Sequence, residues 1–268
     1  MKYCSVNGIE QKNIDITDRG LAYGDGIFTT AKIVNGKVLL LDKHLARLNL
    51  GCQALAIKAP LMALLTQQIA VVAKLYPLAV LKVIITAGSG GRGYSRVGLN
   101  DNATNVIIMV SDFPSHYASL VKQGINLGDS KQQISTSPML AGIKHLNRLE
   151  QVLLRAELDD RLEDDLIVAN SAGDVIEVTS SNLFYWLDGQ LCSPDLSMSG
   201  VNGIIRQLLL EKYPQIKVRK TKFSDLKHTK AMFICNSLMG IMPVKTYNNR
   251  ILTIDAVQDL QNQMKAII

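Results

Sequence analysis

The sequence has no long apolar run and no leader-like start. None of its apolar stretches approaches the roughly 18 residues that a membrane-spanning helix needs, so we expect no membrane partner. The first residues, MKYCSVNGIEQKN, lack the cationic segment followed by an apolar stretch of a secretory leader, and a cytoplasmic location is therefore expected. With 47% hydrophobic and 19% charged residues, the 268-residue chain is an ordinary globular one, long enough for two modest domains.

The spacings that disulfide frameworks, metal sites and serine hydrolases need are also absent. The four cysteines are scattered without a CxxC pair, which favours reduced thiols. They are Cys4, Cys52, Cys192 and Cys235. The four histidines lie far apart and in no HxH or HExxH spacing, and no GxSxG elbow is present. We therefore expect neither a metal centre nor a Ser-His-Asp hydrolase.

Charge is mildly basic, with 29 basic and 23 acidic residues giving a net charge of +6. A basic excess can attract nucleic acid or a small polyanion. The one basic run, residues 217–230, contains a single aromatic residue, Phe223, and no RNA-binding signature. We interpret this run as a solvated face. A non-catalytic module that binds nucleic acid through it is the alternative.

The first hundred or so residues alternate segments of strand and helix length. We expect a short apolar strand over 38–41, followed by Asp42 as the N-cap of a helix with apolar residues at steps of three and four. A second helix is expected over 61–76. Two nearly continuous apolar runs, 79–86 and 104–110, are typical of interior strands.

The second half of the chain has a different pattern of apolar and turn residues. Residues 165–191 are typical of three short strands broken by turns, which predicts an antiparallel meander. Further elements are expected after it: a helix over 203–213, a strand over 231–236 and a terminal helix from 254. We place the domain boundary between Pro114 and Gly124, which predicts an N-terminal α/β domain over 1–114 and a second domain over 124–268.

A polar glycine-rich loop connects the two interior strands. Its residues 88–93, GSGGRG, match the GxGxxG pattern of dinucleotide sites. Such a turn must open a helix that holds the pyrophosphate, whereas residues 94–100 continue as loop, so the pattern does not predict an NAD site. Arg92 and Tyr94 are better candidates for gripping an anionic substrate. A plain surface loop is the alternative.

Lys144 precedes an expected amphipathic helix in the segment AGIKHLNRLE. Leu146, Leu149 and Leu153 would form the apolar face of that helix. Alone, such a lysine is usually a solvated residue at a helix start. A Schiff-base lysine needs a lowered pKa and a carbonyl partner, and ten residues establish neither.

Three distant segments carry further candidates. Glu177 interrupts the apolar face of a predicted strand, where its carboxylate either faces water at a sheet edge or is buried opposite a cationic ring nitrogen of a cofactor. The turn SGVNG at 199–203 opens a helix, and its exposed N–H groups at the positive helix end are suited to a phosphate. Ser237 follows a strand and could add a hydroxyl.

Together these segments resemble the fold-type IV pyridoxal-phosphate (PLP) enzymes, the group of branched-chain aminotransferases, D-amino-acid aminotransferases and aminodeoxychorismate lyases. The matching positions occur in family order: DGIFTT at 25–30, Arg47, Lys144, Glu177 in E(x)4NLF, GVNG at 200–203 and Ser237. Four stretches are similar to the lyases far more than to the aminotransferases. They are SGGRGYS, LAGIKHLNRLEQVL, GVNGIIRQ and MFICNSLMGIMPV.

The resemblance implies an α/β (α+β) fold of two domains with PLP at their interface, in a homodimer whose neighbouring subunit helps close the site. It also implies residue roles. Lys144, in the C-terminal PLP-binding domain, would carry the cofactor as a Schiff base, and Glu177 would face the pyridine nitrogen. Thr30 would lie near the reacting centre. The residues implied for the phosphate are Arg47, Val201, Asn202 and Ser237.

The activity implied is that of a lyase of folate biosynthesis, which converts 4-amino-4-deoxychorismate to 4-aminobenzoate and pyruvate. In such a reaction the lysine amine removes a proton from the substrate ring and aromatisation supplies the drive. An aminotransferase acting on a D- or branched-chain amino acid is the alternative, because both enzymes use the same cofactor residues.

Overall fold

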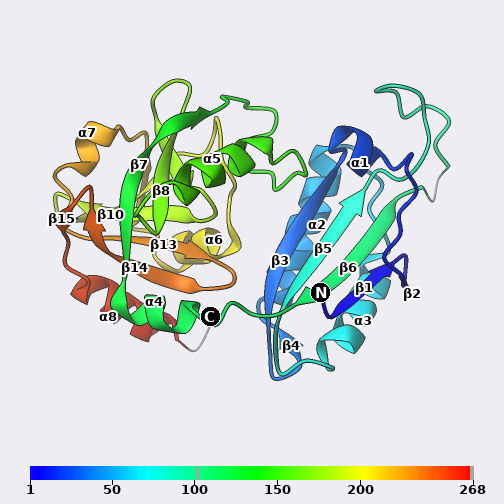
Figure 1. Ribbon diagram of the computed structural model, residues 1–268, viewed down its shortest axis with the longest axis horizontal. Helices are drawn as coiled ribbons and strands as arrows, with labels where there is room; N and C mark the ends of the chain where they lie inside the picture. The colour runs from blue at the N-terminus through cyan, green and yellow to red at the C-terminus, as the bar shows by residue number, and fades with distance from the viewer. Residues whose placement is uncertain (101–102, 266–268) are drawn as a thin grey trace. The chain divides into compact units, whose positions relative to one another are not determined.

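The computed structural model describes residues 1–100 and 103–265. This part of the chain forms two compact units, each with its own β-sheet (Figure 1). Unit 1 comprises the described residues of Met1–Pro114 together with Ile143–Asn147. Unit 2 comprises Ser115–Gly142 and the described residues from Arg148 onward.

The units differ from the predicted domains in two places. Residues 115–123 belong to unit 2, where they include helix α4 (Tyr117–Gln123). Residues 143–147 belong to unit 1, because their backbone hydrogen-bonds to strand β3 (Gly26–Val34). Lys144 therefore lies in unit 1, whereas the sequence placed it in the C-terminal domain.

Unit 1 is built on a six-stranded antiparallel sheet in the order β2-β1-β6-β5-β3-β4. The strands other than β3 are β1 (Tyr3–Val6), β2 (Ile9–Glu10), β4 (Lys37–Val38), β5 (Leu78–Thr86) and β6 (Asn105–Ser111). The interior strands predicted over 79–86 and 104–110 are confirmed as β5 and β6. Both are rich in β-branched residues, which pack well on a pleated sheet.

Three helices accompany this sheet: α1 (Arg19–Tyr23), α2 (Leu41–Ala54) and α3 (Met62–Ala73). The longer two, α2 and α3, pack against one face (Figure 1). Leu48 and Cys52 are buried there, which confirms the predicted apolar face of α2. Asp42 is not the N-cap, because the helix begins one residue earlier and Leu40, with φ of 54°, occupies the cap position. Asp42 instead lies in the first turn, where a carboxylate favours the helix dipole.

Unit 2 contains a nine-stranded mixed sheet, with the order β12-β11-β10-β13-β14-β7-β8-β9 and β15 paired to β14. Its strands are β7 (Ile125–Ile134), β8 (Asp165–Asn170), β9 (Val175–Val178), β10 (Asn182–Leu187), β11 (Gln190–Pro194), β12 (Lys217–Arg219), β13 (Met232–Asn236), β14 (Gly240–Tyr247) and β15 (Arg250–Ile251). The predicted meander is wrong. The segment forms two hairpins, β8–β9 and β10–β11, because β10 pairs with β13 instead of β9.

The helices of unit 2 after α4 are α5 (Leu149–Asp159), α6 (Ile204–Lys212), α7 (Phe223–Leu226) and α8 (Asp255–Met264). The predicted helices over 203–213 and from 254 are confirmed as α6 and α8. The expected apolar face near Lys144 is wrong. Leu149 and Leu153 are 72% and 54% exposed, whereas Leu154 and Leu158 are buried. Leu146 precedes the helix, in a segment that pairs with β3.

The structure also shows the environment of the cysteines and of the basic run over 217–230. The four cysteines are buried free thiols. Along residues 217–230 the lysines are exposed while Thr221, Leu226 and Thr229 point inward, as expected of a solvated face. Within 1–100 and 103–265, no helix combines the length and apolar character that a membrane crossing requires.

Candidate active site

Lys144 lies on an extended segment beside the start of β3. The N–H of Phe28 donates to the Lys144 carbonyl at 2.9 Å, and the N–H of Leu146 donates to the Gly26 carbonyl at 2.9 Å. The Lys144 amine is 4.6 Å from the centre of the Phe28 ring. Helix α5 begins only at Leu149. Lys144 is therefore not a solvated residue at a helix start.

Thr30 and a second lysine share this part of unit 1. Phe28 and Thr30 are two residues apart on β3, so their side chains point to the same face of the sheet. Lys82 on β5 pairs directly with Thr30, and its amine lies 5.0 Å from the centre of the Phe28 ring. Burial lowers the pKa of Lys82. The structure thus brings Lys144 and an unpredicted cation to the Phe28 ring, with Thr30 two residues along on the same face of β3.

Arg47 occupies a buried position on α2. Its guanidinium donates to the Thr29 hydroxyl, which lies 2.6 Å from Nδ1 of His44. Burial lowers the pKa of Arg47 to about 10, and burial together with the Arg47 charge lowers the pKa of His44 to about 3. At neutral pH the arginine is therefore charged and the histidine neutral. Thr29 points to the opposite face of β3 from Phe28, so these contacts do not bring Arg47 to Lys144.

Arg47 has the features of an anion ligand. Among the described residues no carboxylate forms an ion pair with it, and its buried Nε has no hydrogen-bond partner. A buried charge without a counterion is costly. An arginine with unused donors is suited to a phosphate, which its planar fork binds through charge-assisted hydrogen bonds. The position therefore fits the phosphate of a cofactor.

Glu177 belongs to a second group of candidate site residues, which lies in unit 2. It lies on β9 and is only 7% exposed, so it does not face water. Its Oε2 accepts a hydrogen bond of 2.9 Å from the N–H of Val201. Burial lowers the pKa of Arg148, while the negative charges of Glu177 and Glu150 act in the opposite direction. Glu177 is thus a buried carboxylate held by a backbone donor, with a cation in its electrostatic neighbourhood.

The turn after Gly200 is held by the side chains of Asn182 and Glu177. Asn182 donates through Nδ2 to the Val201 carbonyl at 2.8 Å and accepts through Oδ1 from the N–H of Gly203 at 3.1 Å. A Cβ on Gly203 would lie 2.2 Å from that Oδ1, so only glycine allows this approach. Because its N–H is bonded to Glu177 and its carbonyl to Asn182, Val201 has both backbone groups engaged within the chain.

The N–H donors suited to an anion belong to residues that follow Val201 in the chain. Gly203 caps α6 without a side-chain cap, and the first N–H groups of a helix have no intrahelical partner. The Asn202 Oδ1 accepts from Arg206 at 3.0 Å and the Asn202 backbone N–H donates to the Gly142 carbonyl at 3.1 Å, which leaves the side-chain Nδ2 group of Asn202 as a donor. Ser237 directly follows β13, whose Cys235 pairs with Asn182. Asn202, Ser237 and the start of α6 therefore gather at one end of the sheet.

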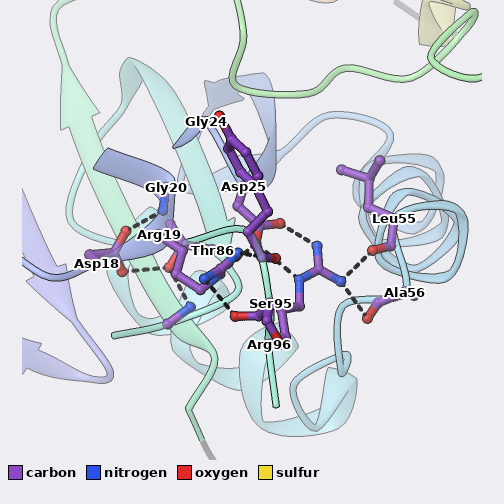
Figure 2. Close-up of polar contacts among 12 residues, drawn as sticks. Asp18, Arg19, Gly20, Gly24, Asp25, Leu55, Ala56, Thr86, Ser95 and Arg96 are labelled. Carbon is purple, nitrogen blue, oxygen red and sulfur yellow. Dashed lines mark hydrogen bonds and ion pairs between the residues drawn. The ribbon is translucent and has the colours of Figure 1, made fainter. Parts of the chain in front are cut away.

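The glycine-rich loop with Arg92 and Tyr94 belongs to unit 1. No helix follows it in residues 88–100, and the sheet beside it is antiparallel, which confirms that GSGGRG is not a dinucleotide turn. Both predicted side chains are exposed, Tyr94 by 87%. Polar contacts of Arg19, Asp25 and Arg96 hold the loop in place (Figure 2).

A comparison with models of known families shows which family the chain belongs to. The model of amino-transferase class IV proteins matches residues 26–247, which span β3, Lys144 and both ends of the unit 2 sheet. The chain belongs to the amino-transferase class IV family. The α/β fold-type IV architecture predicted from the sequence is thereby confirmed.

Individual members of the amino-transferase class IV group match the chain over nearly its whole length. Aminodeoxychorismate lyase from Vibrio harveyi is 34% identical over 243 residues, 89% of either chain. The crystal structure of 4-amino-4-deoxychorismate lyase from Pseudomonas aeruginosa has a TM-score of 0.92 at 35% identity, covering 98% of both. A hypothetical aminotransferase from Mycobacterium tuberculosis, in its PLP-bound form, shares the fold with a TM-score of 0.82 at 18% identity, covering 96% of this chain and 94% of that one.

Several residues of the candidate site were not singled out from the sequence. Lys82 interrupts an apolar strand, the same signal that marked Glu177, and could have been found in that way. Asn182 was visible only as part of the E(x)4NLF motif, and its role depends on the turn that it holds. The neighbourhood of Arg148 and Glu177 carries no sequence signal, because 28 intervening residues place them together only through the fold.

Proposed function

We propose that this chain is a PLP-dependent lyase of folate biosynthesis that converts 4-amino-4-deoxychorismate to 4-aminobenzoate and pyruvate. The cofactor assignment rests on the short chain segment that connects Lys144 to the turn before α6. The backbone of Gly142 is hydrogen-bonded to Gly200 and Asn202 in the turn over 199–203, and only Ile143 separates Gly142 from Lys144. The choice of a lyase is supported by the likeness of the whole chain to two lyases at 34% and 35% identity.

The residues fit the parts of PLP. Arg47, Asn202, Ser237 and the N–H groups at the start of α6 would hold the phosphate. Val201 was also expected there, but its N–H donates to Glu177, so donation to a phosphate would require that bond to be exchanged. When bound, PLP supplies a conjugated ring that accepts electron density from the bond being broken.

Glu177 would hold a proton at the pyridine nitrogen. Its carboxylate is already oriented by the Val201 N–H, so little reorganisation is needed when a cationic ring nitrogen approaches. Burial strengthens this interaction, because a low local dielectric increases the attraction between opposite charges. The ionised form of the carboxylate is the form that this role requires.

Lys144 would carry the cofactor and then move protons. Its amine would accept the proton from the substrate ring carbon that bears the amino group. The C–O bond to the enolpyruvyl group on the neighbouring carbon then breaks, and the ring becomes aromatic. A proton returned to the enolpyruvyl methylene gives pyruvate. General acid–base work of this kind contributes roughly 10²–10⁴-fold to a rate.

The substrate carries carboxylates, and unit 1 offers cations for them. Lys82 presents an amine beside Thr30, and the glycine-rich loop presents Arg92 together with the Tyr94 hydroxyl. We assign Thr30 to the reacting centre because it shares a face of β3 with Phe28, whose ring contacts the Lys144 amine. Arg92 and Tyr94 are assigned to substrate binding.

An aminotransferase is the second candidate, because the matching family is named for that activity and a PLP-bound aminotransferase shares the fold. Its substrate would be a D- or branched-chain amino acid. Release of 4-aminobenzoate and pyruvate from 4-amino-4-deoxychorismate by the purified protein would support the lyase. A keto-acid-dependent half-reaction without lyase turnover would support the aminotransferase instead.

We also propose that the protein is a cytoplasmic homodimer. The exposed apolar residues Leu149, Val152 and Leu153 on α5 give unit 2 a surface that a second subunit could cover. Light scattering after size-exclusion chromatography tests the dimer. A monomeric mass at micromolar concentration would contradict it.

A further inference from the structure

The glycine-rich loop over 88–98 cannot fix its own shape. Gly88, Gly90, Gly91 and Gly93 all have positive φ, between 60° and 106°. Glycine gains this freedom at the cost of a larger entropy loss on ordering. Arg92 lies between two of these glycines and is exposed, so its direction depends on what holds the loop backbone.

Arg19 binds the tip of the loop through three consecutive carbonyls. Its Nη1 donates to the carbonyls of Gly93 and Ser95, both at 3.1 Å, and its Nη2 donates to that of Tyr94 at 2.9 Å. A guanidinium suits this task because its donors form a rigid fork. Gly91 is needed beside it, since a Cβ there would lie 2.8 Å from the Ser95 carbonyl oxygen.

Asp25 joins Arg19 to a second arginine from the loop itself. Its Oδ2 accepts from Nε of Arg19 at 2.8 Å and from Nε of Arg96 at 2.9 Å, and its Oδ1 accepts from Nη2 of Arg96 (Figure 2). Burial opposes ionisation of Asp25, but the bonds from Arg96 and Arg19 hold its pKa below the usual range. Asp25 therefore stays ionised at neutral pH. We name these three residues the Asp25 cluster.

Arg96 extends the cluster to the end of α2. Its Nη1 donates to the carbonyls of Leu55 and Ala56, at 2.7 and 2.9 Å. Asp25 itself directly precedes β3, and its carbonyl accepts from the N–H of Ala87 at 2.9 Å. The loop is thus tied both to α2 and to the strand that pairs with the Lys144 segment.

Tyr94 is oriented by the same arginine from a second side. Its ring lies 5.5 Å from that of Tyr23 in an edge contact, and the Arg19 guanidinium carbon lies 5.0 Å from the centre of the Tyr23 ring. Edge contacts between aromatic rings and cation contacts over a ring are both favourable. Arg19 therefore restrains the backbone of Tyr94 directly and its ring through Tyr23.

We propose that Asp25 is a positioning residue, which fixes the loop over 88–98 through Arg19 and Arg96 so that Arg92 and Tyr94 meet the anionic substrate in a set geometry. The inference rests on the proposed function for the identity of the substrate. It predicts that breaking the cluster weakens substrate binding while the cofactor and the chemical step are retained.

Steady-state kinetics of Asp25→Asn and Arg96→Met test this role. We expect KM for 4-amino-4-deoxychorismate to rise about tenfold, with kcat and the visible absorbance of the bound cofactor unchanged within about twofold. Arg96→Lys should restore part of the loss. Asp112→Asn is the matched control, since Asp112 forms an exposed ion pair with Lys2 at 2.7 Å in the same unit. An unchanged KM, or loss of cofactor, would overturn the proposal.

A double-variant cycle shows whether the cluster acts through Arg92. If it does, Arg92→Ala combined with Arg96→Met should lower kcat/KM by clearly less than the product of the two single losses, because only the part that acts through Tyr94 is still lost. Multiplied losses would contradict a role through Arg92. Should Asp25→Asn fail to fold, Arg96→Met still decides the question, because the Arg96 side chain is 32% exposed on the loop.

Hydrogen exchange of the holoenzyme supplies a readout without substrate. Asp25→Asn or Arg96→Met should accelerate exchange of peptides covering 88–98 about tenfold, while Asp112→Asn should not. Unchanged exchange would overturn the proposal. If the wild-type enzyme forms no 4-aminobenzoate, the proposed function fails, and loop exchange alone then decides whether Asp25 fixes the loop.

Discussion

Lys144 and Phe28 make two contacts. The N–H of Phe28 donates to the Lys144 carbonyl at 2.9 Å, and the Lys144 amine lies 4.6 Å from the centre of the Phe28 ring. The backbone bond fixes where the lysine leaves the chain, and the ring limits where its amine can go. The two contacts give Lys144 a defined position that a helix-start lysine would lack.

Phe28→Leu should therefore reduce kcat by about two- to thirtyfold, because an amine over an aromatic face gains on the order of 0.5–2 kcal/mol. The backbone bond remains, so cofactor absorbance should persist. Phe113→Leu is the control, since Phe113 makes a similar contact with Lys32 at 4.9 Å. Equal kinetic losses in both variants would contradict a specific role for Phe28.

Arg47→Met should separate cofactor binding from stability. Loss of a charged donor to phosphate should weaken PLP binding by about 2–3 kcal/mol, roughly 30- to 150-fold. The apoprotein should be as stable as the wild type or more so, because a buried cation without a counterion is removed. Fluorescence titration with PLP and thermal unfolding of the apoprotein measure the two effects. Loss of stability with unchanged affinity would make Arg47 a structural residue.

His44 predicts a pH dependence of stability. Its pKa is lowered to about 3, so below the unfolded value of 6.5 the unfolded chain binds a proton that the folded chain does not. The free energy of unfolding should then fall as pH falls through this window, by about 2 kcal/mol at about pH 5. Urea unfolding of His44→Gln at about pH 7 and pH 5 tests this. The variant should lose that part of the slope, and an identical slope would refute the assignment.

Glu177→Gln should keep the fold and lose activity. The amide oxygen can still accept from the Val201 N–H, but the negative charge opposite the pyridine nitrogen is gone. Loss of one charged hydrogen bond predicts a fall in kcat of about 10- to 150-fold. Glu150→Gln is the control, because Glu150 also acts on the pKa of Arg148. Comparable turnover of Glu177→Gln and wild type would remove Glu177 from the mechanism.

The sequence predicts individual helices and strands better than it predicts which strands pair with each other. Strands β5 and β6 follow from apolar runs, and the face of α2 follows from residues spaced by three and four, because both signals are local. The placement of Lys144 is not local, since residues 143–147 pair with a strand more than a hundred residues earlier. The predicted meander failed for the same reason: β10 finds β13 instead of β9.

In the candidate site, too, residue types could be predicted from the sequence but their tertiary contacts could not. Arg47, Lys144 and Glu177 could be chosen by residue type and motif order, and Lys82 could have been chosen by the same signal as Glu177. The hydrogen bond that engages the Val201 N–H could not be predicted, because it depends on the close approach of β9 to the turn. Which donors remain for a phosphate is therefore decided by tertiary structure.

The decisive measurement is product release from 4-amino-4-deoxychorismate by the purified holoenzyme and by Lys144→Ala. Wild type should release 4-aminobenzoate and pyruvate in equal amounts and show the absorbance band of bound cofactor near roughly 400–430 nm, and the variant should lose both turnover and band. Turnover in the variant, or a wild type that binds PLP yet releases neither product, would contradict a lyase built on Lys144.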